Sequence, residues 1–151
     1  MAMKTPQVPF LHIATSFSFP FPAVMLFAGL LWGIFGKILV VTNQQGIGKG
    51  LMPVEALTIV HQNMIKEIEK NGGKIDAVYF CPNLKTDEDN CRKPGTAMAE
   101  LARIDFPDII FEKSVMAGDT ESDMLFGRNC GMKTVLINTN RLIMSSNLVD
   151  L

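Results

Sequence analysis

Short apolar runs set the organisation of this chain from residue 37 onward. The run "KILVVT" is apolar or β-branched at nearly every position, which is typical of a strand covered on both faces of a parallel sheet. Three later runs have the same character. The predicted strands are residues 37–42, 75–80, 113–118 and 133–137.

The segments between these strands have the period of amphipathic helices. From 53 to 70, apolar side chains recur three or four positions apart and form one stripe. That stripe consists of Leu57, Val60, Met64 and Ile68. Shorter helices are predicted at 96–103 and 122–129. Strands that alternate with helices favour an α/β fold, a three-layer Rossmann-like parallel sheet with helices on both faces.

The N-terminal region has a different composition. No charged residue occurs from Thr5 to Gly36, and residues 17–36 contain an apolar stretch close to the length of about 17–25 residues that a membrane helix needs. We interpret this stretch as a helix buried against the sheet, and a membrane anchor is the alternative. The chain is therefore divided into an atypical N-terminal segment, 1–36, and a core, 37–151.

Composition narrows the class of protein. A length of 151 residues suits one domain with a hydrophobic core. The net charge of -1 gives no electrostatic footprint for nucleic acid. The three cysteines, Cys81, Cys91 and Cys130, form no disulfide-rich pattern, which favours a reducing, cytoplasmic location. Nothing in the composition indicates an oligomeric state.

Polar clusters follow three of the predicted strands. The first strand runs into Thr42 and the glycine-rich "NQQGIGKG", Arg92 and Lys93 follow the second, and Asp119 and Asp123 follow the third. The carboxyl ends of parallel strands meet at one edge of the sheet, where α/β proteins bind ligands. We therefore expect these clusters to lie together.

The chemistry of the clusters suits a phosphate. The glycine-rich stretch is no P-loop, because its Gly-Lys pair is followed by Gly50 instead of Ser or Thr. A hydroxyl with backbone N–H groups can nest phosphate oxygens, Arg92 and Lys93 add positive charge, and carboxylates hold Mg²⁺. Together they predict a phosphoryl-transfer site. The plainer alternatives are a flexible turn, a solvated basic pair, and Asp119 as a helix N-cap.

Four stretches carry a family resemblance in this order: "VVTNQQGIGKG", "IDAVYFCP", "CRKPG" and "AGDTESDMLFGRNCGMKTVLI". They resemble the haloacid dehalogenase (HAD) superfamily of hydrolases, subfamily IIIA. Within it they are similar to D-glycero-D-manno-heptose 1,7-bisphosphate phosphatases and histidinol-phosphatases. The resemblance implies a Mg²⁺-dependent phosphatase that acts on a small phosphorylated sugar or alcohol.

The resemblance also implies a role for each matching residue. Thr42 would bind the transferring phosphoryl group, and Lys93 would steady that group and the nucleophile, so both are assigned to catalysis and substrate binding. Asp119 would be a magnesium ligand, supported by Asp123. The other implied substrate contacts are Asn43, Gln44, Gln45 and Arg92.

One departure concerns the nucleophile. The family uses an aspartate of a D-x-D motif on its first strand, which should lie before Thr42. The first acidic residue of this chain is Glu55, so we expect the first strand to be missing or atypical and turnover to be impaired or absent. A non-catalytic phosphate-binding descendant is an alternative, and a protein anchored in the membrane through residues 17–36 is another.

A second departure concerns zinc. Many relatives hold a structural zinc with a Cys-x-His and a Cys-x-Cys pair. Only Cys81 and Cys91 remain here, and Asn83 and Asp89 occupy the other two positions. Two thiolates are too few for a closed tetrahedral site, so a zinc ion is not expected.

Overall fold

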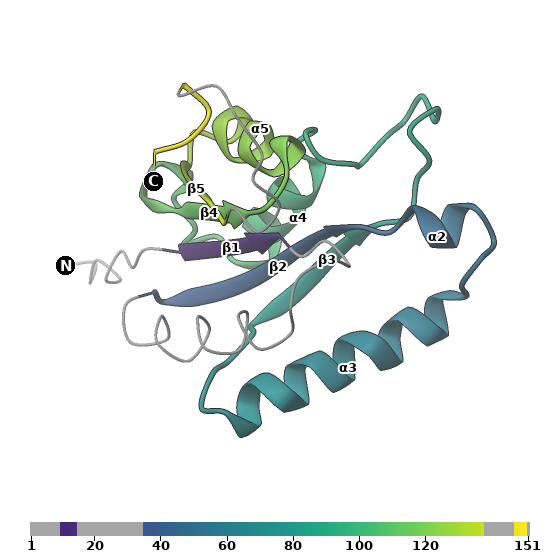
Figure 1. Ribbon diagram of the computed structural model, residues 1–151. Helices are drawn as coiled ribbons and strands as arrows, with labels where there is room; N and C mark the ends of the chain where they lie inside the picture. The colour runs from purple at the N-terminus through teal and green to yellow at the C-terminus, as the bar shows by residue number, and fades with distance from the viewer. Residues whose placement is uncertain (1–9, 15–34, 138–146, 151) are drawn as a thin grey trace.

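The computed structural model describes residues 10–14, 35–137 and 147–150. Its strands form a five-stranded sheet in the order β3-β2-β1-β4-β5, and every neighbouring pair is parallel. The strands are β1 Phe10–Ala14, β2 Lys37–Asn43, β3 Ala77–Cys81, β4 Val115–Gly118 and β5 Lys133–Leu136. All carboxyl ends therefore lie at one edge of the sheet (Figure 1).

Strand β2 shows how the sequence produces the layers. Successive side chains of a strand point to opposite faces. Ile38 and Val40 pack with the helix 54–70 on one face, and Leu39 and Val41 pack with the helices 97–105 and 121–129 on the other. All four are fully buried. An uninterrupted apolar run is thus explained by burial on both faces.

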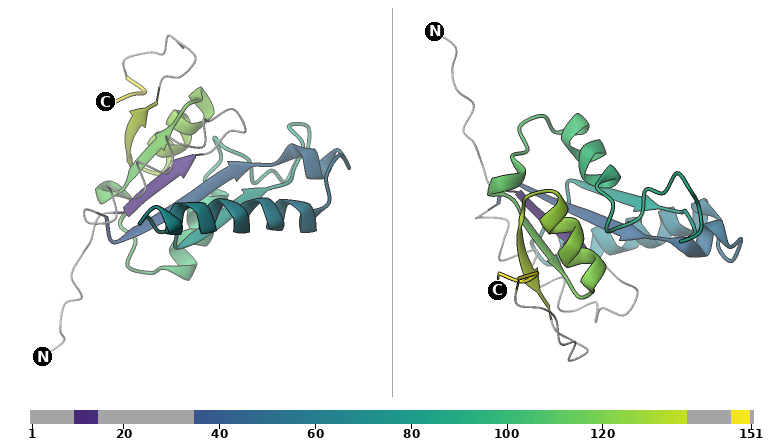
Figure 2. Two further views of the ribbon diagram at one scale, coloured as in Figure 1. Left: turned by 60° about the horizontal axis from the view of Figure 1, so that its bottom comes forward. Right: turned by 90° about the horizontal axis from the view of Figure 1, so that it is seen from above.

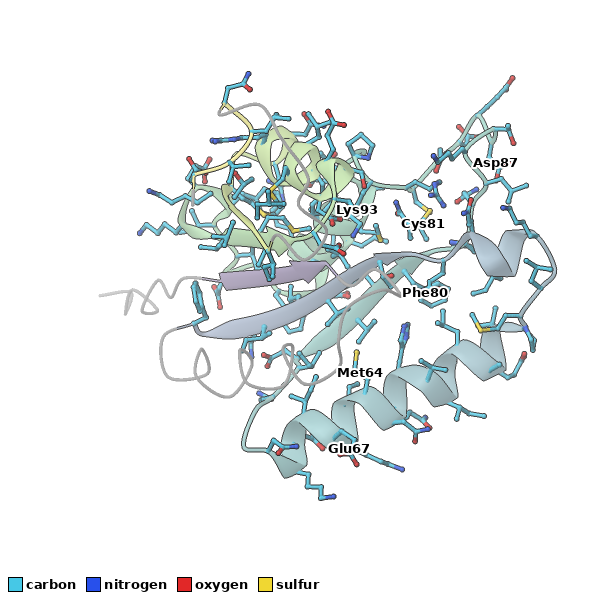
Figure 3. All side chains as sticks on the ribbon, viewed as in Figure 1. Met64, Glu67, Phe80, Cys81, Asp87 and Lys93 are labelled. Carbon is cyan, nitrogen blue, oxygen red and sulfur yellow. A yellow bond between two sulfur atoms is a disulfide. The ribbon has the colours of Figure 1, made fainter. Side chains whose placement is uncertain are left out.

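The helices complete a three-layer structure. Their bounds are α2 Gln45–Gly48, α3 Val54–Lys70, α4 Ala97–Asp105 and α5 Glu121–Asn129, with a 3-10 helix η1 at Phe111–Lys113. Helix α3 lies along one face of the sheet, and α4 and α5 lie on the other (Figures 1 and 2). On α3, Met64 points toward the sheet and Glu67 points away from it (Figure 3). The predicted α/β architecture is confirmed.

The four predicted strands and three predicted helices are present, each within two residues of its predicted bounds. Strand β1 was not predicted from the sequence. This strand lies at the centre of the sheet, paired with both β2 and β4, so the first strand is present, and atypical rather than missing. Its sequence, FLHIA, lies in the uncharged N-terminal stretch that the sequence pattern led us to treat as one atypical segment. The division of the chain at residue 36 stays a prediction, although β1 comes from within the N-terminal segment.

The membrane alternative rests on residues that are largely undescribed. Of residues 17–36, only the last two lie within the described part of the chain. In that described part, no helix is both long enough and apolar enough to cross a bilayer.

A charged cluster closes the amino-terminal end of β2 and β3. One carboxylate oxygen of Asp76 accepts a hydrogen bond from the Ile38 amide at 2.9 Å. The other faces the ammonium groups of Lys37 at 3.2 Å and Lys74 at 2.7 Å. Burial alone would raise the pKa of Asp76, but the bonds from Lys74, the Ile38 amide and Lys37 outweigh it and lower the pKa. This cluster, here called the Asp76 cluster, lies at the end of β2 away from the predicted site.

Candidate functional site

The carboxyl edge of the sheet gathers polar residues from three elements. Thr42 is the penultimate residue of β2, Lys93 lies in the loop after β3, and Asp119 directly follows β4. With Asp123 of α5 they are among the few buried polar residues, each at most 6% exposed. Lys93 lies above the carboxyl ends of the central strands (Figure 3). The predicted placement at one edge is thus observed, and the roles of these residues stay predictions.

Lys93 is held at its ammonium group. Its Nζ lies 2.7 Å from Oδ1 of Asp123 and donates to the Val41 carbonyl at 2.9 Å. Burial lowers the pKa of Lys93, and the carboxylates of Asp123 and Asp119 oppose that shift. An ammonium has three N–H donors, and these two contacts among the described residues use two. The third can serve an anionic ligand.

Asp123 is fixed by the start of α5. Thr120 is the N-cap and forms a capping box with Asp123. Oδ2 of Asp123 accepts from the Thr120 hydroxyl at 2.7 Å and from the Thr120 amide at 3.1 Å. A Cβ added at Gly118 would lie 2.5 Å from that of Asp123. Both carboxylate oxygens of Asp123 therefore have partners within the protein, Oδ1 in Lys93 and Oδ2 in Thr120. The spacing Thr-x-x-Asp in the sequence could have predicted this cap.

The N-cap assignment bears on Asp119. The plainer alternative made Asp119 the cap of α5, and that alternative is wrong because Thr120 holds the position. The Asp119 side chain is 3% exposed and adjoins the Lys93–Asp123 pair. A carboxylate here suits Mg²⁺, which is often held by one or two carboxylates and keeps several waters. Among the described residues no group of three or more His, Cys, Asp or Glu side chains that could hold a metal ion is found.

Asn43 and Gln44 contact other site residues. The Asn43 amide accepts from the Lys93 backbone N–H at 3.0 Å and donates to the Lys93 carbonyl at 3.3 Å. Nε2 of Gln44 donates to Oγ1 of Thr42 at 3.0 Å. Gln45 is the first residue of α2. The substrate contacts predicted for these three residues remain predictions.

The loop from β3 to Lys93 is closed by a disulfide. Cys81 and Cys91 are bonded, with their Cα atoms 5.6 Å apart, within the ordinary range for disulfides. The sequence analysis expected reduced cysteines; in the structure only Cys130 is free, and burial raises its pKa to about 12. The Arg92 guanidinium donates to the Asn83 carbonyl at 3.0 Å. Arg92 is therefore anchored to the loop whose ends the disulfide joins.

The position expected for the nucleophile lies at the end of β1. This strand pairs with β2 through Ala14 and Val41 and with β4 through Ile13 and Ala117. Its carboxyl end thus lies between Thr42 and Asp119. The two residues after Ala14 are threonine and serine, and no acidic residue precedes Glu55.

Comparison with known proteins gives the same class. Residues 90–142 match the HAD-hydrolase-like family. The D-glycero-beta-D-manno-heptose-1,7-bisphosphate 7-phosphatase of Helicobacter pylori strain J99 is 37% identical over 107 residues, which are 68% of this chain and 59% of that protein. The histidine biosynthesis bifunctional protein HisB of Blochmanniella floridana is 34% identical over 103 residues, 66% of this chain and 28% of that protein. The chain thus spans about a quarter to three fifths of these relatives' lengths.

Solved structures support the fold. The D,D-heptose 1,7-bisphosphate phosphatase of B. bronchiseptica, complexed with magnesium and phosphate, gives a TM-score of 0.75 at 22% identity. The match covers 85% of this chain and 79% of that one. A putative HAD-like phosphatase of Mesorhizobium loti gives 0.76 at 21% identity over 90% and 75% of the two chains.

These findings place the chain in a family. It belongs to the HAD-like hydrolase superfamily. Its relatives within that superfamily include heptose bisphosphate phosphatases and HisB proteins.

Proposed function

We propose that this chain forms a phosphate-monoester site of the HAD type that binds a small phosphorylated sugar or alcohol with Mg²⁺ and hydrolyses it at or near the background rate. The supporting observation is the Lys93–Asp123 pair, buried at the carboxyl edge beside Thr42 and Asp119. The same edge receives the end of β1, in a chain with no acidic residue before Glu55.

Each site residue has a role in this proposal. The Thr42 hydroxyl and the backbone N–H groups after β2 bind phosphoryl oxygens, and the ammonium of Lys93 balances their charge. Arg92 and Gln45 contact the rest of the substrate. Asp119 holds Mg²⁺, which supplies further charge neutralisation when bound. None of these groups replaces the covalent nucleophile that divides a difficult displacement into two easier steps.

The substrate class comes from the relatives. The relatives described above include a heptose bisphosphate 7-phosphatase and a bifunctional protein of histidine biosynthesis. Sugar bisphosphates and histidinol phosphate are both small phosphate monoesters, and the proposed site recognises the phosphate they share. The test therefore includes both, together with a generic aryl phosphate.

The experiment separates binding from turnover. Titration calorimetry with inorganic phosphate and Mg²⁺ should detect weak binding that Lys93→Met removes. Phosphate release from the three substrates should stay at background. A chimera whose residues 1–16 are replaced by a first strand with D-x-D-G-T should gain Mg²⁺-dependent turnover.

The controls decide between the outcomes. Asp119→Ala should abolish the effect of Mg²⁺, whereas Asp108→Ala, at an exposed position, should not. Turnover by the unmodified chain that Asp119→Ala abolishes would show that another residue acts as nucleophile. Absence of phosphate binding under all conditions would refute the proposal.

Two further proposals concern zinc and location. We expect well under one equivalent of zinc in protein purified without added metal, because Asn83 and Asp89 are poor replacements for His and Cys. A cytoplasmic location would keep Cys81 and Cys91 reduced. Trapping free thiols with an alkylating reagent at cell lysis tests this, and a bonded pair in the trapped protein would argue against that location.

A further inference from the structure

The Asn43 side chain acts as a backbone partner for Lys93. Its carbonyl oxygen accepts from the Lys93 N–H at 3.0 Å, and its NH₂ donates to the Lys93 carbonyl at 3.3 Å. One amide thus pairs with both backbone groups of a single residue, as a neighbouring strand would. This two-point contact is here called the Asn43 clamp.

Lys93 is therefore held at both of its ends by the same strand. Its backbone is bonded to Asn43, and its ammonium group donates to the carbonyl of Val41 at 2.9 Å. Thr42 lies between these two residues in β2. Because Lys93 is bonded to the residues on either side of Thr42, the contacts that hold it to the strand end also set where its ammonium lies near the threonine.

The loop before Lys93 reinforces this arrangement. Cys81 is the register partner of Asn43 across β2 and β3, and its disulfide with Cys91 fixes the chain two residues before Lys93. Asn43, together with the disulfide when it is formed, therefore holds the Arg92–Lys93 segment to the ends of adjacent strands. A long side chain that is ordered before binding loses less freedom when a ligand arrives.

We infer that Asn43 is a positioning residue that sets the Lys93 ammonium for an anion bound at Thr42, and that this is its main contribution to the site. The inference rests on the proposed function, because it names how that site is ordered. It differs from the role that the family resemblance implied, a direct substrate contact, because the amide oxygen and one N–H of the amide nitrogen are bonded to the Lys93 backbone.

The test compares Asn43→Ala and Asn43→Asp with Asn71→Ala, a control at the exposed carboxyl-terminal cap of α3. Amide hydrogen exchange at Lys93 and inorganic phosphate affinity with Mg²⁺ are measured in each full-length variant. Asn43→Ala should speed exchange at Lys93 about tenfold, the loss of roughly one hydrogen bond, and weaken phosphate binding several-fold. Asn71→Ala should change neither.

Asn43→Asp separates the two halves of the clamp. It keeps an oxygen for the Lys93 N–H but removes the donor to the Lys93 carbonyl, so it should restore slow exchange at Lys93. This selective rescue would not follow from a general loss of stability. It also keeps the test decisive if Asn43→Ala fails to fold, because fast Lys93 exchange in Asn43→Asp would overturn the inference.

The remaining outcomes separate the inference from the proposed function. If Lys93→Met binds phosphate as the parent does, the proposed function fails, and the inference fails with it. If Lys93→Met loses phosphate while Asn43→Ala keeps it, only the inference fails. Weaker phosphate binding by Asn43→Ala with unchanged Lys93 exchange would show that Asn43 contacts the ligand directly, and would also overturn the inference.

Discussion

Two lysine–carboxylate clusters lie at opposite ends of β2. At the amino end, Asp76 faces Lys37 and Lys74; at the carboxyl end, Asp123 faces Lys93. The two carboxylate side chains are equally hidden, 4% and 2% exposed. The lysines differ, because Lys37 and Lys74 are 34% and 42% exposed and Lys93 is 4% exposed.

This difference separates a structural cluster from the cluster that is proposed to be functional. Asp76 also accepts a hydrogen bond from the Ile38 amide, so its carboxylate provides a partner for a backbone N–H at the start of β2. Lys37 and Lys74 stay partly exposed and therefore keep much of their hydration. Burying both members of an ion pair removes two charges from water, and apolar residues of similar volume are often at least as stabilising. Stability alone therefore gives no reason for the Lys93–Asp123 pair, whereas a phosphate site does.

Replacing Lys93 by Met should have the largest effect on stability. The change leaves Oδ1 of the buried Asp123 facing an apolar group. Removing one partner of a buried pair costs about 3–5 kcal/mol. Urea denaturation of the full chain measures this loss. Adding Asp123→Asn in the same chain removes the uncompensated charge and should recover part of it. A cost below about 1 kcal/mol, the range of exposed pairs, would erase the contrast between the two clusters.

Reducing the disulfide should have the next largest effect. Cys81 and Cys91 close a loop with a sequence separation of 10, and the chain-entropy relation gives about 2–3 kcal/mol for that length. Amide exchange should quicken selectively in the loop before Lys93, while the Ile38 amide, bonded to Asp76, should change only with global stability.

A variant in which both bonded cysteines are replaced provides the control for this prediction. Replacing Cys81 and Cys91 together by serine should reproduce the loss and remove the response to reductant. An equal response to reductant at both ends of β2 would show that the disulfide does not act locally.

The sequence predicted the layers because burial on both faces leaves a periodic signal. The run 37–42 and the stripe on 53–70 each repeat a pattern whose physical cause is one packing surface. The central strand β1 was not predicted, because the uncharged N-terminal stretch in which its sequence FLHIA lies was interpreted as a single atypical segment. The placement of the three polar clusters at one edge of the sheet could be predicted from the parallel direction of the strands alone.

The residues that lie in the candidate site could be predicted from the sequence, but the contacts between them could not. Lys37 and Lys74 lie at or just before the starts of β2 and β3, and Lys93 lies in the loop after β3. The stretch CRKPG singled out Lys93, but no local pattern showed that its side chain is the buried one of the three. The Asn43 clamp joins residues 50 positions apart, so no periodicity reports it. The disulfide was not predicted, because the prediction used only the number of cysteines and the compartment they suggested. Whether Cys81 and Cys91 lie close enough to bond depends on the fold.

Replacing Asp76 by Asn should have a smaller effect, about 1–2 kcal/mol, near the value of one hydrogen bond to a charged group. The pKa of Asp76 is lowered in the folded protein, so its contribution is present above the unfolded value of about 3.9 and is lost as pH falls through the folded value. The difference between parent and variant should therefore be full at pH 7 and shrink below about pH 4. A difference that grows with acidity would contradict this assignment.

Replacing Lys74 by Met should have the smallest effect, at most about 0.5–1 kcal/mol. Lys74 is 42% exposed, and Lys37 and the Ile38 amide remain bonded to Asp76 after the change, so the carboxylate is not left uncompensated. Exposed pairs are screened by salt, and the cost should fall between low and high ionic strength in urea denaturation. The cost of Lys93→Met should stay nearly constant over the same range, because salt screens a buried pair much less. A Lys74 cost as large and as insensitive to salt as that of Lys93 would mean that lysine exposure does not distinguish the two clusters, and that the Lys93–Asp123 pair needs no functional explanation.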